Sequence, residues 1–322
     1  MTSIKKCVII QTDEWHTKHK HTKEQLKIMS FIILTDGISD LDKDLREKYN
    51  IEYIPFMISC DNENGKEYTA TLDWESFSAK EYYDRMRKGD QFRTTQIQII
   101  AYEEYFTKYL SHGKDVLYVA VSSGLSGSYN ASLLARDSVL EKFPDRKIVC
   151  VDTLRASGAL GLMTIKAAQM RDEGKSMKEI EAWLLDNRLC YHQYGTVEDM
   201  VYLKRSGRIT GVQHIMSKVL NIKPIIISNT KGENVSLTKV RGRKKALNKQ
   251  IELLKENVIE PENNTLFIVH GDCLDVAEEL RDDILKEVKF KDAIINTINP
   301  TVGATTGPGM IGVYFYGKKV VI

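Results

Sequence analysis

Short apolar runs alternate with segments of helical periodicity from Phe31 onward, and this alternation limits the fold more than any other feature of the chain. In the first half, the pattern predicts strands at 31–35, 53–59, 116–121 and 147–151 and helices at 40–48, 72–87, 97–110 and 129–142. Strands and helices in this order favour a mainly parallel sheet with helices on both faces. In such sheets, ligands bind beyond the carboxyl ends of the strands.

The second half mixes helices with hairpins. Ser176 and Glu179 have the spacing of a capping box at the start of a helix, and Lys231-Gly232 suggests a hairpin turn. Strands are predicted at 193–197, 222–228, 235–240, 265–270, 293–298 and 310–316, and helices from 244 and at 274–288. We therefore expect an N-terminal extension at 1–30 that is a mobile tail, a mainly parallel α/β domain at 31–152, and an α/β domain with a mixed or antiparallel sheet at 153–322.

The composition is that of an ordinary globular chain and excludes several classes of protein. Hydrophobic residues make up 42% and charged residues 28% of the 322 residues. No apolar run is long enough to span a bilayer, and the charged N-terminus does not have the pattern of a signal peptide. We expect a cytoplasmic protein without stable membrane insertion. The five cysteines are far apart and form no CxxC pair, which argues against disulfides and a zinc site.

The net charge of +2 is unevenly distributed along the chain. The first 30 residues carry +3, so the remainder is close to neutral, which argues against nucleic-acid binding. The basic run at 239–245 is the local exception. The simpler interpretation is a helix start that faces solvent, and the alternative is a surface that binds an acidic partner, a phosphate or DNA. His16, His19 and His21 could bind a metal ion, but a polar tail is the simpler interpretation, and we expect no metal site.

The most informative motif is the run of serines and glycines at 122–128, between a predicted strand and a predicted helix. We call it the serine loop. The free N–H groups of the following helix start would receive a carboxylate or a phosphate, and the glycines let the backbone approach the ligand. An ordinary turn with serine as the helix cap is the alternative. Three further segments rich in hydroxyls and glycine favour the binding interpretation: 93–96, 206–211 and 303–309.

No catalytic set assembles around the serine loop. His270 lies in an unrelated segment, and Asp36 and Asp40 flank a turn into a helix, where capping explains them. No Walker motif or dinucleotide fingerprint occurs. The residues favour a binding protein over an enzyme, without a cofactor. The alternative is a serine-dependent enzyme that acts on an acyl or phosphorylated small molecule, with Ser123 or Ser126 as its nucleophile.

Seven motifs in order make the chain from Phe31 to its C-terminus resemble the DegV family. They are TDGISDL (35–41), TTQ (94–96), SSGLSGSY (122–129), SGRI (206–209), IKPI (222–225), KVRG (239–242) and GPG (307–309). The resemblance implies two α/β domains with a long-chain fatty acid bound between them. Members of the family include the binding subunits of bacterial fatty acid kinase. These present the carboxylate to a separate ATP-binding kinase, which makes an acyl phosphate for phospholipid synthesis.

The resemblance also implies the residues of the site. The hydroxyls expected to hold the carboxylate are those of Thr94, Thr95, Ser122, Ser123, Ser126, Thr305 and Thr306. The arginines expected at the head-group end or in docking of the kinase are Arg208, Arg241 and Arg243.

The chain departs from the family pattern at three places. Thr305 stands where the family usually has a histidine, Ile97 replaces a proline, and Gly37-Ile38 replaces a Ser-Thr pair. Thr305 can donate a hydrogen bond but cannot supply a positive charge. Burial of one methylene contributes about 0.8 kcal/mol, whereas a neutral hydrogen bond contributes about 1 kcal/mol net. We therefore expect the change at Thr305 to affect head-group orientation and phosphoryl transfer more than affinity for the acyl chain.

Overall fold

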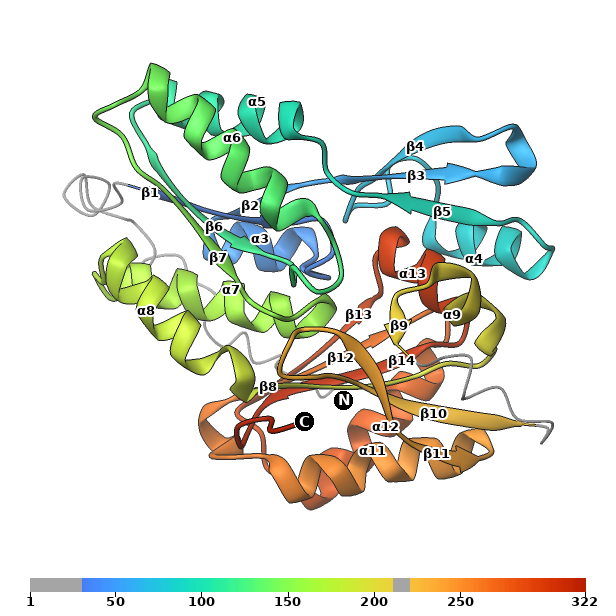
Figure 1. Cartoon of the computed structure of the whole chain (residues 1–322). Coiled ribbons are helices and arrows are strands. Elements are labelled where there is room, and N and C mark those ends of the chain that lie inside the picture. Colours follow the sequence, from blue (N-terminus) through green and yellow to red (C-terminus); the bar gives the residue numbers. More distant parts are fainter. Residues whose placement is uncertain (1–30, 211–220) are drawn as a thin grey trace, which may run out of the picture.

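The computed structural model of the chain describes residues 31–210 and 221–322 (Figure 1). The predicted extension at 1–30, with His16, His19 and His21, lies outside the described residues. The described residues form three sheets with covering helices, and this mixed α/β architecture confirms the predicted fold class.

The first sheet has four parallel strands in the order β2-β1-β6-β7. The strands are β1 (Phe31–Asp36), β2 (Ile51–Ile54), β6 (Asp115–Ala120) and β7 (Ile148–Asp152). One face is covered by α5 (Ile99–Ser111) and α6 (Ser128–Lys142), and the other by α3 (Lys43–Tyr49), α7 (Ser157–Asp172) and α8 (Met177–Asn187) (Figure 1). Because both faces are covered, β1 and β6 are nearly continuous buried runs.

A three-stranded antiparallel sheet in the order β4-β3-β5 extends the first half of the chain. Its strands are β3 (Phe56–Cys60), β4 (Lys66–Ala70) and β5 (Phe92–Thr95). The strand expected at 53–59 is in fact divided at Pro55 between two sheets, since proline cannot donate a ladder hydrogen bond. The helix expected at 72–87 forms only over α4 (Ala79–Arg87). Trp74 has a left-handed φ of 58°, and the Ser78 side chain caps the helix start.

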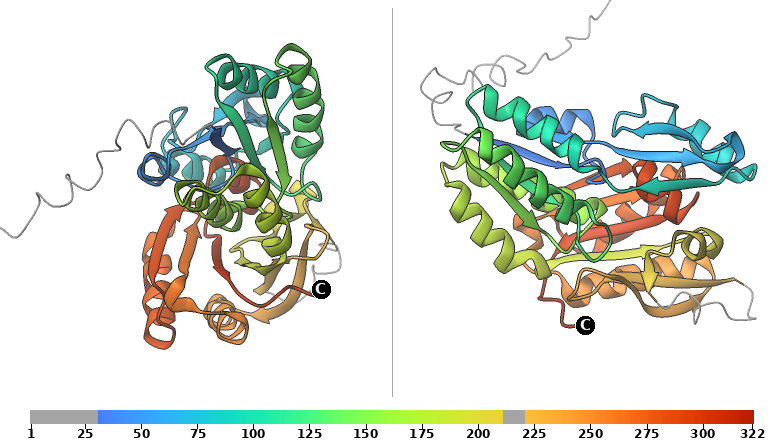
Figure 2. Two further views of the ribbon diagram at one scale, coloured as in Figure 1. Left: turned by 90° about the vertical axis from the view of Figure 1, so that its left-hand side faces the viewer. Right: turned by 45° about the horizontal axis from the view of Figure 1, so that its top comes forward.

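The third sheet is mixed and has seven strands in the order β13-β12-β14-β8-β10-β11-β9. The strands are β8 (Tyr191–Thr196), β9 (Ile209–Thr210), β10 (Ile222–Ser228), β11 (Asn234–Arg241), β12 (Thr265–His270), β13 (Asp292–Thr297) and β14 (Ile311–Tyr316). The pairs β12–β13 and β9–β11 are parallel, and the other pairs are antiparallel. Helices α11 (Arg243–Asn257) and α12 (Leu274–Glu287) cover the outer face (Figure 2).

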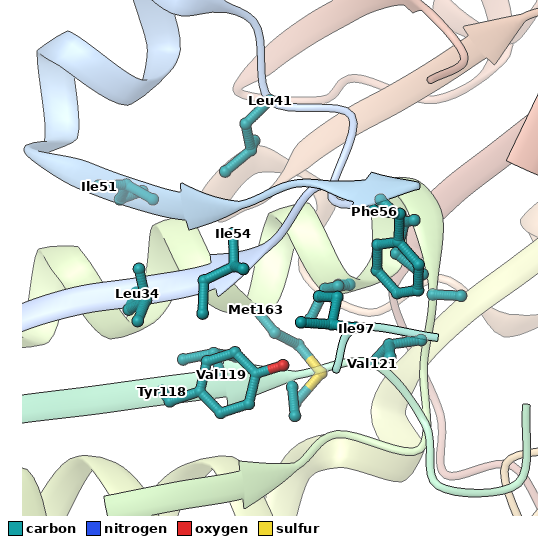
Figure 3. Packing of buried hydrophobic residues seen from close by; sticks show 14 of the residues in the cluster. Leu34, Leu41, Ile51, Ile54, Phe56, Ile97, Tyr118, Val119, Val121 and Met163 are labelled. Carbon is teal, nitrogen blue, oxygen red and sulfur yellow. The ribbon is translucent and has the colours of Figure 1, made fainter. Parts of the chain in front are cut away.

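Helix α7 lies between the first and the third sheet and is buried along most of its length (Figures 1 and 2). Two glycines permit the close approach. A Cβ at Gly158 would lie 2.5 Å from the Tyr314 ring, and a Cβ at Gly161 would lie 2.3 Å from the Ser39 carbonyl oxygen. Figure 3 shows part of the core between α7 and the first sheet, including Leu34, Ile54, Val119 and Met163.

Two short helices bring the end of the chain to the three-stranded sheet. Helix α9 (Met200–Ser206) packs against α13 (Pro300–Thr306), and α13 contacts β3 and β5.

Helix α8 begins with the predicted capping box at Ser176. One-turn 3₁₀ helices lie at η1 (Asp61–Glu63), η2 (Arg188–Cys190) and η3 (Pro261–Asn263). Within residues 31–210 and 221–322, no helix combines the length and the apolar character that crossing a membrane requires.

Candidate ligand-binding site

A cavity of about 560 Å³ lies at the carboxyl end of β6. We call it the central cavity. Its wall combines segments from both halves of the chain: the serine loop, the end of β5, the start of α7, strands β8 and β10, and α13. The position matches the expectation for a parallel sheet, and the volume is within the range of roughly 300–1,000 Å³ that is usual for small-molecule sites.

The wall of the central cavity combines apolar side chains with hydroxyls. The apolar side chains include those of Ile38, Phe56, Val121, Val197, Ile226 and Met310. The hydroxyl residues include Thr94, Thr95, Ser123, Ser126, Thr305 and Thr306. Arg208 is the one lining residue with a formally charged side chain, as far as the described residues go. Such a wall suits a ligand with a long apolar body and a single negative head group.

Six of the seven predicted hydroxyl residues thus line the central cavity, and Ser122 does not. The Ser122 side chain is fully buried, and its Oγ donates to the Gly232 carbonyl at 2.8 Å. The same oxygen accepts from the Gly124 N–H at 3.1 Å. These contacts suit a residue that positions the serine loop rather than one that contacts a ligand.

The other serines of the loop have partners of their own. Ser123 Oγ donates to Asp152 Oδ2 at 2.6 Å, and Ser126 Oγ lies 2.8 Å from Ser128 Oγ, where either hydroxyl can be the donor. Helix α6 begins directly after Gly127, which lines the cavity and has no side chain to cap the helix. The positive end of the α6 dipole therefore lies at the wall of the central cavity.

The predicted threonines differ in how free their hydroxyls are. Thr305 and Thr306 both donate to the Val302 carbonyl, at 2.8 and 2.9 Å. Thr94 Oγ1, in contrast, has no hydrogen-bond partner in the part of the chain that the structure describes. Because a hydroxyl has only one hydrogen to donate, Thr94 and Ser126 are the best placed to donate to a ligand.

The three predicted arginines lie in different environments. Arg208 lines the central cavity at an exposed position, whereas Arg241 is exposed at the end of β11. Arg243 Nη1 donates to Glu198 Oε2 at 2.9 Å and to the Gly309 carbonyl at 2.7 Å. Arg243 therefore fixes the turn that follows α13.

Sequence reasoning missed a buried hydrogen-bond network beside the central cavity. Asp40 accepts from Ser157 Oγ and from the N–H and Nδ2 of Asn299, at 2.9 and 2.6 Å for the latter two. Tyr314 Oη donates to Ser157 Oγ at 2.8 Å, and both of these residues line the cavity. Burial raises the pKa of Asp40 to about 6. No local pattern could reveal the network, because Asn299 is 259 residues from Asp40.

The interpretation of Asp36 and Asp40 as helix caps is wrong. Asp42 caps α3 instead. Asp36 is fully buried at the end of β1 and accepts from the Tyr118 hydroxyl and the Val121 N–H. It thereby ties β1 to the chain just before the serine loop, and burial raises its pKa to about 6.

His270 lies at another hollow, of about 360 Å³, that does not include the serine loop. Its Nδ1 accepts from the Cys273 N–H at 3.2 Å, and burial lowers its pKa. This is a hydrogen-bonded structural histidine. Among residues 31–210 and 221–322, no cluster of three or more histidine, cysteine or acidic side chains is arranged to hold a metal ion.

Comparison with known protein families gives one consistent match. A model of the DegV family matches residues 30–318. A DegV domain-containing protein of Clostridium perfringens is 37% identical over 287 residues, which cover 89% of this chain and 97% of that protein. Another, from Streptococcus pyogenes serotype M1, is 31% identical over 295 residues, which cover 90% of this chain and 99% of that protein.

Solved structures of other proteins, including DegV family members, share the fold, and three examples illustrate the similarity. A DegV lipid-binding protein from Thermotoga maritima is 28% identical, with a TM-score of 0.80 over 91% of this chain and 100% of that protein. A second protein from that organism, described as revealing a fatty-acid-binding function, is 29% identical, with a TM-score of 0.78 over 90% and 100%. A DegV family protein from Thermus thermophilus, described by its fatty acid binding, is 26% identical, with a TM-score of 0.79 over 90% and 100%.

Proposed function

The chain belongs to the DegV family, and on this premise we propose that it binds a long-chain fatty acid in the central cavity. One observation carries the proposal: the cavity wall combines apolar side chains with hydroxyls and a helix N-terminus, and among the described residues Arg208 is its one charged residue. Three relatives of the same fold are described as lipid-binding or fatty-acid-binding proteins.

The apolar wall would supply most of the affinity. Each buried methylene contributes about 0.8 kcal/mol, so a chain of about fifteen methylenes gains roughly 12 kcal/mol before the entropic costs of binding. A hydrogen bond from a hydroxyl to the charged carboxylate contributes about 1.5–3 kcal/mol. The hydroxyls would therefore orient the head group more than they retain the ligand.

The carboxylate would lie between Thr94, Ser126 and the start of α6. Thr94 Oγ1 has no partner among the described residues, Ser126 can donate in place of its bond to Ser128, and α6 presents its positive end. Arg208 would balance the negative charge. Thr305 would contribute less, because its hydrogen already bonds the Val302 carbonyl.

We further propose that the protein acts in the cytoplasm and performs no chemistry of its own. It would present the carboxylate to a separate ATP-dependent kinase, which makes an acyl phosphate for phospholipid synthesis. The support is the position of Arg208, which is exposed and also lines the cavity. A kinase could therefore approach the head group from the side of this arginine, and the exposed Arg241 is a second candidate contact.

Native mass spectrometry of the purified protein tests the proposal. We expect one bound molecule with the mass of a long-chain fatty acid, and exchange for added palmitate. A cavity that is empty and also rejects added acids would overturn the proposal. Labelling of Ser123 or Ser126 by a fluorophosphonate would instead support a serine-dependent enzyme.

A further inference from the structure

The hollow of about 360 Å³ at His270 lies at the carboxyl ends of two parallel strands, β12 and β13. We call it the histidine hollow. His270 and Thr297 are paired at the ends of these strands, so their side chains project from the same face of the sheet. In the described ranges, the histidine hollow shares no lining residue with the central cavity. It is therefore a separate space in a position where parallel strands often bind ligands.

His270 presents a hydrogen-bond donor to the histidine hollow. Its Nδ1 accepts from the Cys273 N–H at 3.2 Å, so the hydrogen of the neutral ring is on Nε2. Burial lowers the pKa of His270, which keeps the ring neutral near pH 7. The side chain is only 6% exposed, and Nε2 has no hydrogen-bond partner within residues 31–210 and 221–322. A buried donor without a partner is costly, which favours a ligand that supplies an acceptor.

Thr297 and Asn296 add one further donor and one acceptor. The Thr297 hydroxyl forms no hydrogen bond with another residue that the structure describes. Asn296 Nδ2 donates to the Asp40 carbonyl at 2.8 Å, whereas no described residue donates to Asn296 Oδ1. The polar part of the wall therefore offers two neutral donors beside an amide oxygen. Such a set matches the edge of a ring that carries both acceptors and N–H groups.

Apolar side chains form the rest of the wall: Leu41, Leu72, Trp74, Leu274 and Ile295. The indole of Trp74 is half-buried, and its centroid lies 5.7 Å from the Tyr82 ring and 6.0 Å from the Tyr83 ring. These rings hold the indole in place. A fixed aromatic ring in the wall of a hollow is a stacking surface for a flat ligand, and nucleobases stack on aromatic side chains in this way.

The charges around the histidine hollow argue against an anionic ligand. No lysine or arginine among the described residues lines it, whereas Asp40 and Asp42 do. Asp275 adds a further negative charge that acts on His270. Helix α12 begins beside the hollow without a side-chain cap, but the positive end of one helix does not balance these carboxylates. A neutral ligand fits this wall better than a phosphate or a carboxylate.

We propose that the histidine hollow binds the base of a nucleoside. The base would lie against Trp74, and its ring nitrogens or carbonyl groups would accept from His270 and Thr297. Its N–H groups would donate to Asn296, and the exposed carboxylate of Asp42 would accept from the ribose hydroxyls. This assignment is independent of the fatty-acid proposal, because the two spaces are lined by different residues.

NMR titration of the full chain with adenosine, guanosine, cytidine and uridine tests the assignment. Ribose and inorganic phosphate are titrated for comparison. His270→Asn keeps an acceptor for the Cys273 N–H but removes the donor at Nε2, whereas His270→Gln places an amide N–H near the position of Nε2. Thermal melting checks that each variant folds.

A matched pair of threonine variants completes the set. Thr297→Val removes the second donor with little change in shape. Thr265→Val is its control, because Thr265 begins the same pair of strands at the opposite end and does not line the hollow.

We expect at least one nucleoside to bind with a Kd of about 1 mM or tighter, and ribose and phosphate not to bind. His270→Asn and Thr297→Val should each weaken that nucleoside about fivefold, whereas His270→Gln and Thr265→Val should stay within about twofold of the wild type. Binding of no nucleoside, or of phosphate alone, would overturn the assignment. So would unchanged affinity in Thr297→Val, a result that holds even if His270→Asn fails to fold.

Discussion

The hydroxyl of Ser122 donates a 2.8 Å hydrogen bond to the carbonyl of Gly232, 110 residues further along the chain. This bond joins the serine loop to the hairpin between β10 and β11. The two segments also touch closely at Gly124, where a Cβ would lie 2.7 Å from the Lys231 carbonyl oxygen. The head-group end of the proposed site is therefore built across the two halves of the chain.

Substitution of Gly124 tests that contact. Gly124→Ala should lower the free energy of unfolding by about 2 kcal/mol, because its methyl group would meet backbone atoms of the hairpin. Gly127→Ala is the matched control in the same loop. Its methyl would meet the end of the flexible Gln96 side chain, and alanine is a poorer helix cap, so we expect a loss of at most about 1 kcal/mol. Urea denaturation measures both, and equal losses would contradict the contact.

The state of the threonine hydroxyls gives a second prediction. Thr94→Val should weaken palmitate binding about tenfold or more, since a hydrogen bond to a charged acceptor contributes about 1.5–3 kcal/mol. Thr305→Val should weaken it less than about threefold, because that hydroxyl already donates to Val302. Titration calorimetry on the two variants compares them directly. A larger effect at Thr305 than at Thr94 would show that the head group lies elsewhere.

Asp40 should give the protein a pH-dependent term in its stability. Burial raises its pKa from 3.8 to about 6, so the folded protein holds this proton more tightly than the unfolded chain does. The stabilisation is complete below about pH 4 and is lost as the pH rises through about 6. The advantage of the wild type over Asp40→Asn should therefore shrink, by an amount on the order of 1–3 kcal/mol, between pH 4 and pH 7.

Urea denaturation at several pH values measures this difference. Burial lowers the pKa of His192 and of His270, which acts in the opposite direction over the same pH range. Both histidines are present in both proteins, so their effect cancels in the comparison. A difference in unfolding free energy that is constant with pH would contradict the assignment.

Arg243 and Arg241 should behave differently although both were expected in docking. Arg243→Met should lower the free energy of unfolding by about 1–3 kcal/mol, because the Gly309 carbonyl would lose its side-chain donor and Glu198 would keep only Lys223 as a cationic partner. Arg241→Met, at an exposed position, should change it by less than about 0.5 kcal/mol. Thermal and urea unfolding distinguish them. If Arg241→Met also reduces phosphorylation of the bound acid by a partner kinase, its role is docking.

Sequence patterns predicted the fold wherever apolar periodicity is strong. The parallel strands around Val116 and Ile148 and the capping box at Ser176 are local signals, and the structure has them. The third strand of the three-stranded sheet, β5, was missed because it is a four-residue strand with exposed polar residues. The left-handed conformation of Trp74 is imposed by its neighbours in space, so the helix expected there could not be corrected from the sequence.

The candidate site was predictable only as a set of segments. Hydroxyl-rich motifs indicated which segments line the central cavity, and the serine loop lies there because it follows β6, a strand of the parallel sheet. The direction of each hydroxyl was not predictable. Whether a serine or threonine faces a ligand depends on distant carbonyls, as the bond from Ser122 to Gly232 illustrates. The Asp40 network needed the same long-range information.

The placement of α7 has a consequence for how the molecule can be divided. Its apolar surface is shared between two sheets, so a fragment that ended before Ser157 would keep only α3 on one face of the first sheet and leave the rest of that face uncovered. A fragment that began there would expose half of the helix to water. Neither piece would have a complete interior, and an excised half should aggregate or remain unfolded rather than persist as a stable module.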